Sequence, residues 1–245
     1  MRKVVIHVAA AAALLLSAAA AAVAADLKGW GVVVLHGKGG NPASMANVTA
    51  ALSAAGAVVV APSMSWASGY ATYDQSLDEV AGHVAALRGR GATRIALVGH
   101  SLGANVALGY AARRDGIAAV VAMAPGHQPD KFIGKTSGSL QRAKAAIAAG
   151  RGNEIGSYTD INQGREFVVR TSAAAYVSFF DPAGAALMGR NAAWLRGARL
   201  LWVVGSGDPG AQAVTHGGKV ITVSASHMGT PGAGAADVVA WLGSQ

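Results

Sequence analysis

Short apolar runs alternate along the chain with stretches whose apolar residues recur at helical spacing. Six runs are rich in Val, Ile, Leu and Ala, and most of them are bounded by Gly or Pro, which is typical of a fully buried strand. The predicted strands are residues 31–35, 57–61, 94–98, 117–124, 198–204 and 219–224.

Four stretches between or after these runs have a helical period. Within residues 73–90, for example, Leu77, Val80, Val84 and Leu87 fall on one face of a helix. The predicted helices are residues 42–55, 73–90, 101–114 and 233–242. Apolar strands that alternate with helices predict an α/β fold, with a mostly parallel central sheet covered by helices on both faces.

Residues 127–194 break this alternation. The segment is richer in charged and aromatic residues than the rest of the chain and shows helical patches without clear strands. We interpret it as an insertion that packs over one edge of the sheet. No internal repeat and no linker separates a second domain, so residues 26–245 are predicted to form one domain.

The first 25 residues have the pattern of an export signal. Arg2 and Lys3 precede the apolar residues 4–16, and small residues follow up to Asp26, the first acidic residue. This order is typical of a cleaved secretory signal peptide. The alternative is a membrane anchor, since the apolar tract is long enough to span if its alanines are counted. We expect export to the periplasm or the medium, with no stable membrane anchor after cleavage.

Composition removes several classes of function. Hydrophobic residues make up 52% of the chain and charged residues 13%, which argues against disorder. The chain has no Cys, which excludes disulfides, a thiolate nucleophile and Cys-ligated metals. The net charge is +8, and +6 once Arg2 and Lys3 are removed. These charges are scattered and lack an aromatic platform, so no nucleic-acid partner is expected.

Gly99-His100-Ser101-Leu102-Gly103 carries the strongest chemical signal, because it fits G-x-S-x-G. A predicted strand ends directly before the motif and a predicted helix follows it. In such a turn the glycines let neighbouring chains approach, and the serine hydroxyl projects from the carboxyl edge of the sheet. Ser101 is therefore the predicted nucleophile.

A serine nucleophile needs a base, and the base needs an orienting carboxylate. His227 follows the last predicted strand and is the favoured base, with His216 as the alternative. Asp208 follows the strand at 198–204 and is the favoured acid, with Asp181 as its rival. The order Ser101, Asp208, His227 is the one that a nucleophile on a G-x-S-x-G turn requires.

The Gly-rich turn His36-Gly37-Lys38-Gly39-Gly40 follows the first strand and predicts an oxyanion hole. The backbone N–H groups of Lys38 and Leu102 are the candidate donors. The side chain of Lys38 is expected to add only solubility.

The glycines in Gly205-Ser206-Gly207-Asp208-Pro209-Gly210 match a dinucleotide fingerprint, but Pro209 lies within the match and no acidic residue follows at the required distance. We therefore expect neither a cofactor nor a metal.

With these motifs the chain resembles the α/β-hydrolase superfamily of serine hydrolases, in particular its esterases and lipases. The resemblance covers residues 29–245 and rests on residues 36–40, residues 99–103, Asp208 and His227. It implies a mostly parallel sheet of about eight strands, a helical cap formed by residues 127–194, and a two-step acyl-enzyme mechanism without a cofactor.

The resulting expectation is a hydrolase of carboxylic esters that acts on a small molecule through Ser101, Asp208 and His227. Thioester or amide hydrolysis, or acyl transfer, on the same residues remains open, as does a scaffold that only binds a ligand. Candidate substrate contacts, each equally plausible as a core residue, are Met64, Trp66, Tyr70, Tyr176, Phe179 and Phe180. The sequence does not indicate the oligomeric state.

Overall fold

A computed structural model describes residues 25–212 and 217–245 of the 245-residue chain. The predicted signal peptide therefore lies outside the described residues, apart from Ala25, and so does His216, the alternative base. Export remains a prediction from the sequence.

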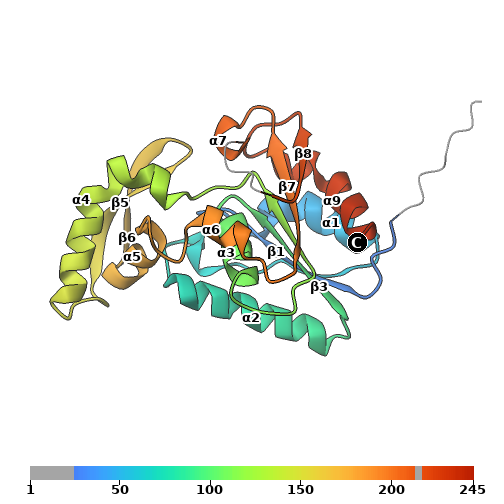
Figure 1. The fold of residues 1–245 in the computed structure, drawn as a ribbon, viewed down its shortest axis with the longest axis horizontal. Coiled ribbons are helices and arrows are strands. Elements are labelled where there is room, and N and C mark those ends of the chain that lie inside the picture. The colour runs from blue at the N-terminus through green and yellow to red at the C-terminus, as the bar shows by residue number, and fades with distance from the viewer. Residues whose placement is uncertain (1–24, 213–216) are drawn as a thin grey trace, which may run out of the picture.

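Six parallel strands form the central sheet, in the order β2-β1-β3-β4-β7-β8 (Figure 1). Their bounds are Trp30–Leu35 (β1), Val58–Val60 (β2), Arg94–His100 (β3), Ala119–Met123 (β4), Arg199–Gly205 (β7) and Lys219–Val223 (β8). Each of the six apolar runs is a strand, which confirms the predicted α/β class. The inner strands β1, β3, β4 and β7 are almost wholly buried because helices cover both faces there, whereas the edge strands β2 and β8 are partly exposed.

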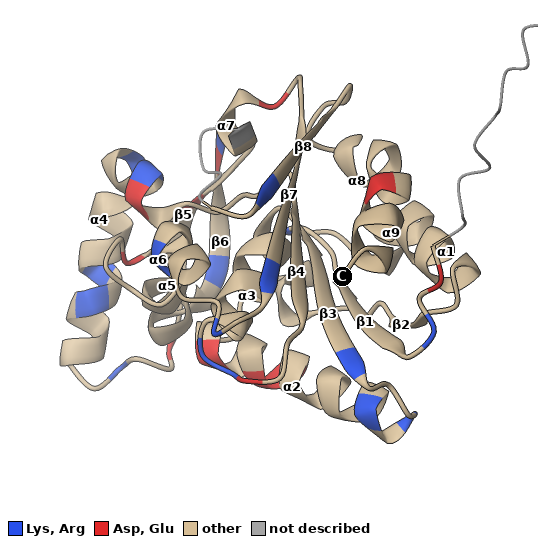
Figure 2. Ribbon diagram, turned by 45° about the vertical axis from the view of Figure 1, so that its right-hand side comes forward, with Lys and Arg blue, Asp and Glu red and all other residues tan. Residues whose placement is uncertain are grey.

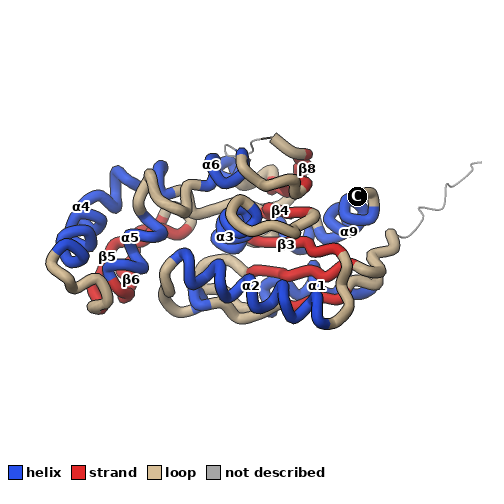
Figure 3. The backbone as a smooth tube through the Cα atoms, turned by 60° about the horizontal axis from the view of Figure 1, so that its bottom comes forward, coloured by secondary structure: helices blue, strands red, loops and turns tan. Residues whose placement is uncertain are grey.

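Helices cover the two faces as expected (Figures 1 and 3). On one face lie α1 (Ala46–Ala54) and α9 (Ala235–Gly243), and on the other α2 (Tyr73–Gly89) and α3 (Leu102–Ala111). Helix α2 begins at a capping box in which Thr72 and Gln75 satisfy each other's backbone N–H groups. The short helices are η1 (Pro42–Met45), η2 (Ser65–Ala67), α7 (Pro209–Gln212) and α8 (Thr230–Ala233).

Successive residues of the inner strands pack into two separate cores, because side chains alternate across a sheet. In β1, Val33 and Leu35 pack with α2 and α3, whereas Val32 and Val34 pack with α1 and α9. The first of these cores continues into the aromatic residues of the insertion. The sheet and the insertion are therefore held together by one apolar cluster.

The insertion between β4 and β7 combines helices with an antiparallel hairpin (Figures 1 and 3). Its elements are α4 (Pro129–Ala148), β5 (Ile155–Asn162), β6 (Arg165–Ser172), α5 (Ala173–Phe180) and α6 (Met188–Ala193). The expected helical cap is thus present as helices α4, α5 and α6, but it also contains a hairpin that was not expected. The expected eight strands also divide differently: six are in the central sheet and two are in this hairpin, which among the described residues pairs with no strand of the sheet.

The hairpin turns at Gln163 and Gly164, which have φ of 48° and 79°. Positive φ at both central residues defines the type I′ turn, whose twist matches that of antiparallel strands. Gly adopts this conformation without strain, whereas Gln163 does so at a cost. The turn brings the tip of the hairpin to the carboxyl edge of the central sheet, over the site described below.

Charged residues are spread over the molecule (Figure 2). Lys and Arg occur on α2, α4, β6 and at strand ends, with Asp and Glu among them. Within residues 25–212 and 217–245, none of the helices combines the length and the apolarity that a bilayer crossing demands.

The strand order reverses between β1 and β3, since the chain passes from β1 outward to β2 and then returns to β3 on the other side. At such a reversal the loops after the two strands diverge and leave a crevice at the carboxyl edge, where open α/β sheets bind ligands. The loop after β1 contains Lys38, and the turn after β3 contains Ser101. The fold therefore places both predicted motifs at one crevice.

Candidate active site

Ser101 occupies the sharp turn between β3 and α3 in a strained backbone conformation, with φ 55° and ψ −115°. For a residue other than Gly this conformation costs on the order of 1–3 kcal/mol and persists only where the surroundings enforce it. Here the Ser101 N–H donates to the Met123 carbonyl at 3.0 Å. A Cβ on Gly103 would lie 2.5 Å from the Leu35 carbonyl oxygen, so α3 packs against β1 only because that position is Gly.

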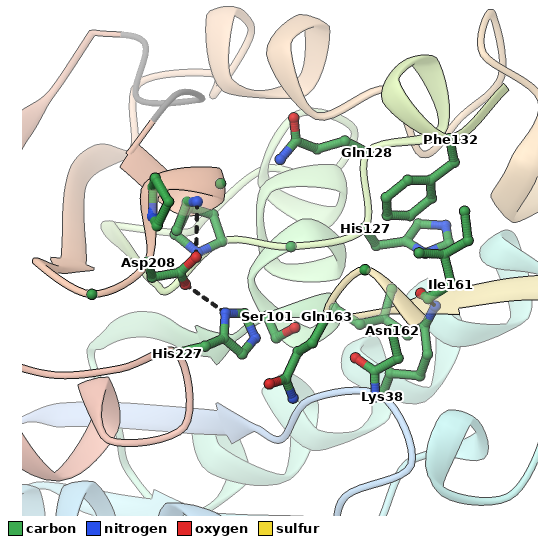
Figure 4. A pocket seen from close by; sticks show the side chains of 18 residues that line it. Lys38, Ser101, His127, Gln128, Phe132, Ile161, Asn162, Gln163, Asp208 and His227 are labelled. Atoms are coloured by element: carbon green, nitrogen blue, oxygen red, sulfur yellow. Dashed lines mark hydrogen bonds and ion pairs between the residues drawn. The ribbon is translucent and has the colours of Figure 1, made fainter. Parts of the chain in front are cut away.

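Asp208 and His227 meet at the end of the neighbouring strands β7 and β8. Asp208 Oδ2 lies 2.5 Å from His227 Nδ1, and Asp208 Oδ1 accepts from the Ala211 N–H at 3.2 Å. Since the carboxylate accepts, Nδ1 carries the proton and Nε2 is left as the basic nitrogen. Figure 4 shows this second nitrogen on the side of Ser101.

Ser101, Asp208 and His227 line one cavity of about 380 Å³. Its walls come from the loop after β1, the turn after β3, the loop after β4, the hairpin tip and α7 (Figure 4). Ser101 is 8% exposed, so its hydroxyl is sheltered but reachable. Among the described residues no hydrogen bond joins Ser101 to His227; hydrogen bonds of this kind often form only once a substrate is bound.

The loop after β1 is fixed by residues 64–66. Met64 N–H donates to His36 Nε2 at 3.0 Å, and Trp66 Nε1 donates to the His36 carbonyl at 3.0 Å. Gly39 N–H in turn donates to the Trp66 carbonyl at 3.0 Å. Burial lowers the pKa of the His36 imidazole, and the hydrogen bond that its Nδ1–H donates to the Gly37 carbonyl opposes this shift.

The backbone N–H groups of Lys38 and Leu102 have no hydrogen-bond partner within the described part of the chain. Both residues line the cavity that contains Ser101, and Leu102 is the first residue of α3. The first N–H groups of a helix lack internal partners and carry partial positive charge, which suits them to a developing anion. These features agree with the predicted role of the two N–H groups as oxyanion-hole donors.

The Lys38 side chain is not a solubilising group, so that expectation is wrong. Only 9% of it is exposed, and its Nζ lies 2.5 Å from Asp160 Oδ1 in the hairpin. It also donates to the Ile161 carbonyl at 2.9 Å. Burial lowers the pKa of Lys38, and the adjacent Asp160 charge opposes that shift.

His100, the residue before Ser101, contacts His227. Its Nε2–H donates to the His227 carbonyl at 3.0 Å, and the two rings lie 5.0 Å apart. Burial, followed by the proximity of His227, lowers the pKa of His100 to about 4. His100 therefore stays neutral near pH 7 and does not repel a protonated His227.

The other sequence candidates lie in different places. Asp181, the rival acid, forms an ion pair with Lys144 at 2.8 Å, and that hydrogen bond lowers its pKa. Trp66 and Tyr70 line a groove of about 1000 Å³ beside the cavity. The remaining candidates are buried in the core and line neither the cavity nor the groove: Met64, Tyr176, Phe179 and Phe180.

Sequence reasoning missed several residues of the site. A Cβ on Gly126, after β4, would lie 2.7 Å from Ser101 Oγ, so this glycine makes room for the hydroxyl. Gln128, Asn162 and Gln163 bring carboxamides to the cavity (Figure 4). The Gln163-Gly164 pair between two runs rich in β-branched and aromatic residues was a usable hairpin signal. No sequence pattern near Gly126 indicated that it lies beside the Ser101 hydroxyl.

In the described ranges no three His, Asp or Glu side chains converge as a metal ion would require. The chemistry that the arrangement can perform is nucleophilic: a sheltered hydroxyl, an imidazole with a free nitrogen held by a carboxylate, and two unpartnered N–H groups meet at one cavity.

Comparison with known proteins agrees with this architecture. The chain belongs to the alpha/beta hydrolase family, whose model matches residues 32–243. A search of curated proteins finds no match.

Three solved structures illustrate the likeness in fold. A monoacylglycerol lipase of Paleococcus ferrophilus is 20% identical with a TM-score of 0.64, over 87% of this chain and 94% of that one. A structure from the metagenome-derived lipolytic enzymes LipS and LipT is 16% identical with a TM-score of 0.58, over 89% and 95%. The esterase domain of a Rhodothermus marinus protein is 16% identical with a TM-score of 0.56, over 89% and 86%.

Proposed function

We propose that the protein is a serine hydrolase that cleaves small-molecule carboxylic esters, with Ser101 as nucleophile, His227 as base and Asp208 as its orienting acid. The observation that carries the proposal is the Asp208–His227 pair, 2.5 Å apart, beside a serine held in strained backbone at the same cavity. A binding scaffold has no need of this combination.

In the first step Ser101 Oγ attacks the ester carbonyl carbon while His227 Nε2 takes the hydroxyl proton. The carbonyl oxygen becomes negative and accepts from the N–H groups of Lys38 and Leu102. When the intermediate collapses, the C–O bond to the alcohol breaks, and His227 returns the proton to the departing alcohol. The product is an acyl ester of Ser101.

In the second step water attacks the acyl-enzyme as His227 takes a proton from it. Collapse of the second intermediate releases the carboxylic acid, and the proton passes back to Ser101. Asp208 holds the imidazole in the required tautomer throughout and stabilises its charged form. No step requires a redox partner or a cofactor.

Ester hydrolysis is favoured over its alternatives because two of the structural neighbours are a lipase and an esterase domain. Their identity to this chain, 20% and 16%, is too low to transfer a substrate. Thioester or amide hydrolysis and acyl transfer would use the same residues, so the substrate must be tested directly.

The test compares an aryl ester, a thioester and an anilide of equal acyl length, with wild type and with Ser101→Ala. We expect the wild-type protein to hydrolyse the ester, and to hydrolyse the anilide more slowly than the ester. We expect Ser101→Ala to hydrolyse neither. Equal turnover by Ser101→Ala would overturn the proposed nucleophile. No turnover of any of the three substrates by a folded wild-type protein would favour the binding scaffold.

A further inference from the structure

The side chain of Lys38 crosses from the central domain into the insertion. Its backbone belongs to the loop after β1, at the cavity of Ser101, whereas its ammonium ends against Asp160 and the Ile161 carbonyl in β5. The side chains of Lys38 and Asp160 are 9% and 1% exposed. This buried ion pair is a direct polar link between the loop and the hairpin.

Each oxygen of the Asp160 carboxylate accepts at least one hydrogen bond. Oδ1 accepts from Lys38 Nζ and, at 2.6 Å, from the Ile161 N–H, and Oδ2 accepts from the Tyr70 hydroxyl at 2.7 Å. Burial and the adjacent Asp160 raise the pKa of Tyr70, so this hydroxyl stays a donor. The carboxylate therefore has one orientation, and it holds the ammonium in one place.

Aromatic rings enclose the ammonium on its other sides. Four ring centroids lie between 5.6 and 6.0 Å from Lys38 Nζ, a distance at which a cation interacts with the face of a ring. The rings belong to Tyr70, Phe132, Phe167 and Phe180. Three of the four lie in the insertion, so the insertion builds most of the enclosure.

Such a pair is a poor choice for stability alone. Desolvation of two charges offsets most of their attraction, and well-packed apolar residues stabilise a core equally well or better. What an ion pair with a hydrogen-bonded carboxylate adds is a defined position for the groups attached to it. This ammonium belongs to Lys38, which lines the cavity and whose backbone N–H is the proposed oxyanion donor.

We propose that Asp160 is a positioning residue of this enzyme: it anchors the Lys38 side chain beneath the hairpin and thereby fixes the Lys38 N–H at the point where the oxyanion forms. The inference rests on the proposed function. It makes the insertion part of the catalytic machinery as well as a wall of the cavity, since a displaced hairpin would also displace the N–H.

The first variant is Asp160→Asn, measured with p-nitrophenyl acetate. The loss of one oxyanion donor costs on the order of 10²–10³ in kcat; a displaced donor should cost part of this, about 10- to 100-fold, with KM changed less than about threefold. Glu166→Gln is the matched control, because Glu166 forms an exposed ion pair with Lys135 on the same hairpin. The control should retain wild-type kcat.

A double variant, Lys38→Met with Asp160→Leu, separates positioning from stability. It removes both charges, so we expect its melting temperature to recover to near wild type while its kcat stays as low as that of Asp160→Asn. Recovery of kcat together with the melting temperature would overturn the proposal, because the pair would then act only as packing. The double variant also provides the test if Asp160→Asn fails to fold.

The proposed function and the positioning role of Asp160 can be refuted independently. If Ser101→Ala keeps wild-type turnover, the proposed function is wrong. If Ser101 is required but Asp160→Asn has wild-type kcat, the function stands and the positioning role is wrong.

Discussion

Replacement of Gly126 by Ala tests whether the Ser101 hydroxyl is the attacking group without altering any ionisable residue. The φ of Gly126 lies outside the left-handed region, so Ala fits its backbone. The added Cβ would lie 2.7 Å from Ser101 Oγ but 3.4 Å from its Cα, an ordinary contact. The substitution therefore displaces the Ser101 hydroxyl and leaves the backbone of the turn unchanged.

The size of the effect follows from that contact. Oγ must retreat by roughly 0.7 Å or adopt another rotamer, and misplacement on this scale costs on the order of 10²-fold in rate. The free energy of unfolding should change little. Replacing Gly by Ala at a compatible position lowers the entropy of the unfolded chain and so stabilises the protein by about 0.4–1 kcal/mol, which partly offsets the cost of the clash. We expect a kcat about 100-fold below wild type and a melting temperature within about 4 °C of it.

The assay is turnover of p-nitrophenyl acetate, together with the rate of inactivation by a fluorophosphonate. Gly134→Ala in α4 is the matched control, because a Cβ at this exposed position meets no atom within 4 Å. It should leave both rates unchanged. A folded Gly126→Ala protein with wild-type kcat and inactivation rate would refute the assignment of Ser101 Oγ as the attacking atom.

Three further predictions concern the acid, the packing of the turn and the buried imidazoles. Asp208→Asn should lower kcat by about 10⁴ without unfolding the protein, because the amide favours the wrong imidazole tautomer; a loss below tenfold would contradict its role. Gly103→Ala should destabilise by about 3 kcal/mol or more in urea titrations, since its Cβ would lie 2.6 Å from the His36 carbonyl oxygen; wild-type stability would contradict the packing described. Burial lowers the pKa of His100 to about 4 and of His127 to about 3, so between pH 6.5 and about 4 it is mainly the unfolded chain that takes up protons at these two imidazoles. The free energy of unfolding should therefore fall between pH 6.5 and 4.5, by up to about 1.4 kcal/mol per pH unit for each imidazole, and a flat profile would contradict the burial.

The sequence predicted the central sheet well because its signal is local. Each strand is a run of apolar residues between turn-forming residues, and six such runs became six strands. The expectation of about eight strands in the sheet came from the family resemblance, and it was less accurate than the count of six apolar runs. The order of Ser101, Asp208 and His227 was also readable, since the fold brings the carboxyl ends of β3, β7 and β8 to one edge.

The contacts of the insertion could not be read in the same way. Lys38 and Asp160 lie 122 positions apart, and no pattern near either residue indicates a buried partner. Lys38 appeared as a polar residue in a Gly-rich turn, for which solvent is the usual environment. From the sequence Met64 and Trp66 were equally plausible as substrate contacts and as core residues, and only the structure shows that both form hydrogen bonds to His36 that fix the loop after β1.

The central claim is that Ser101 is the nucleophile, and the most direct measurement is the site of a covalent adduct. The wild-type protein, treated with a fluorophosphonate and digested, should give one modified peptide with the phosphonate on Ser101, and Ser101→Ala should give none. A stable adduct on a different serine, or labelling that survives Ser101→Ala, would contradict the account.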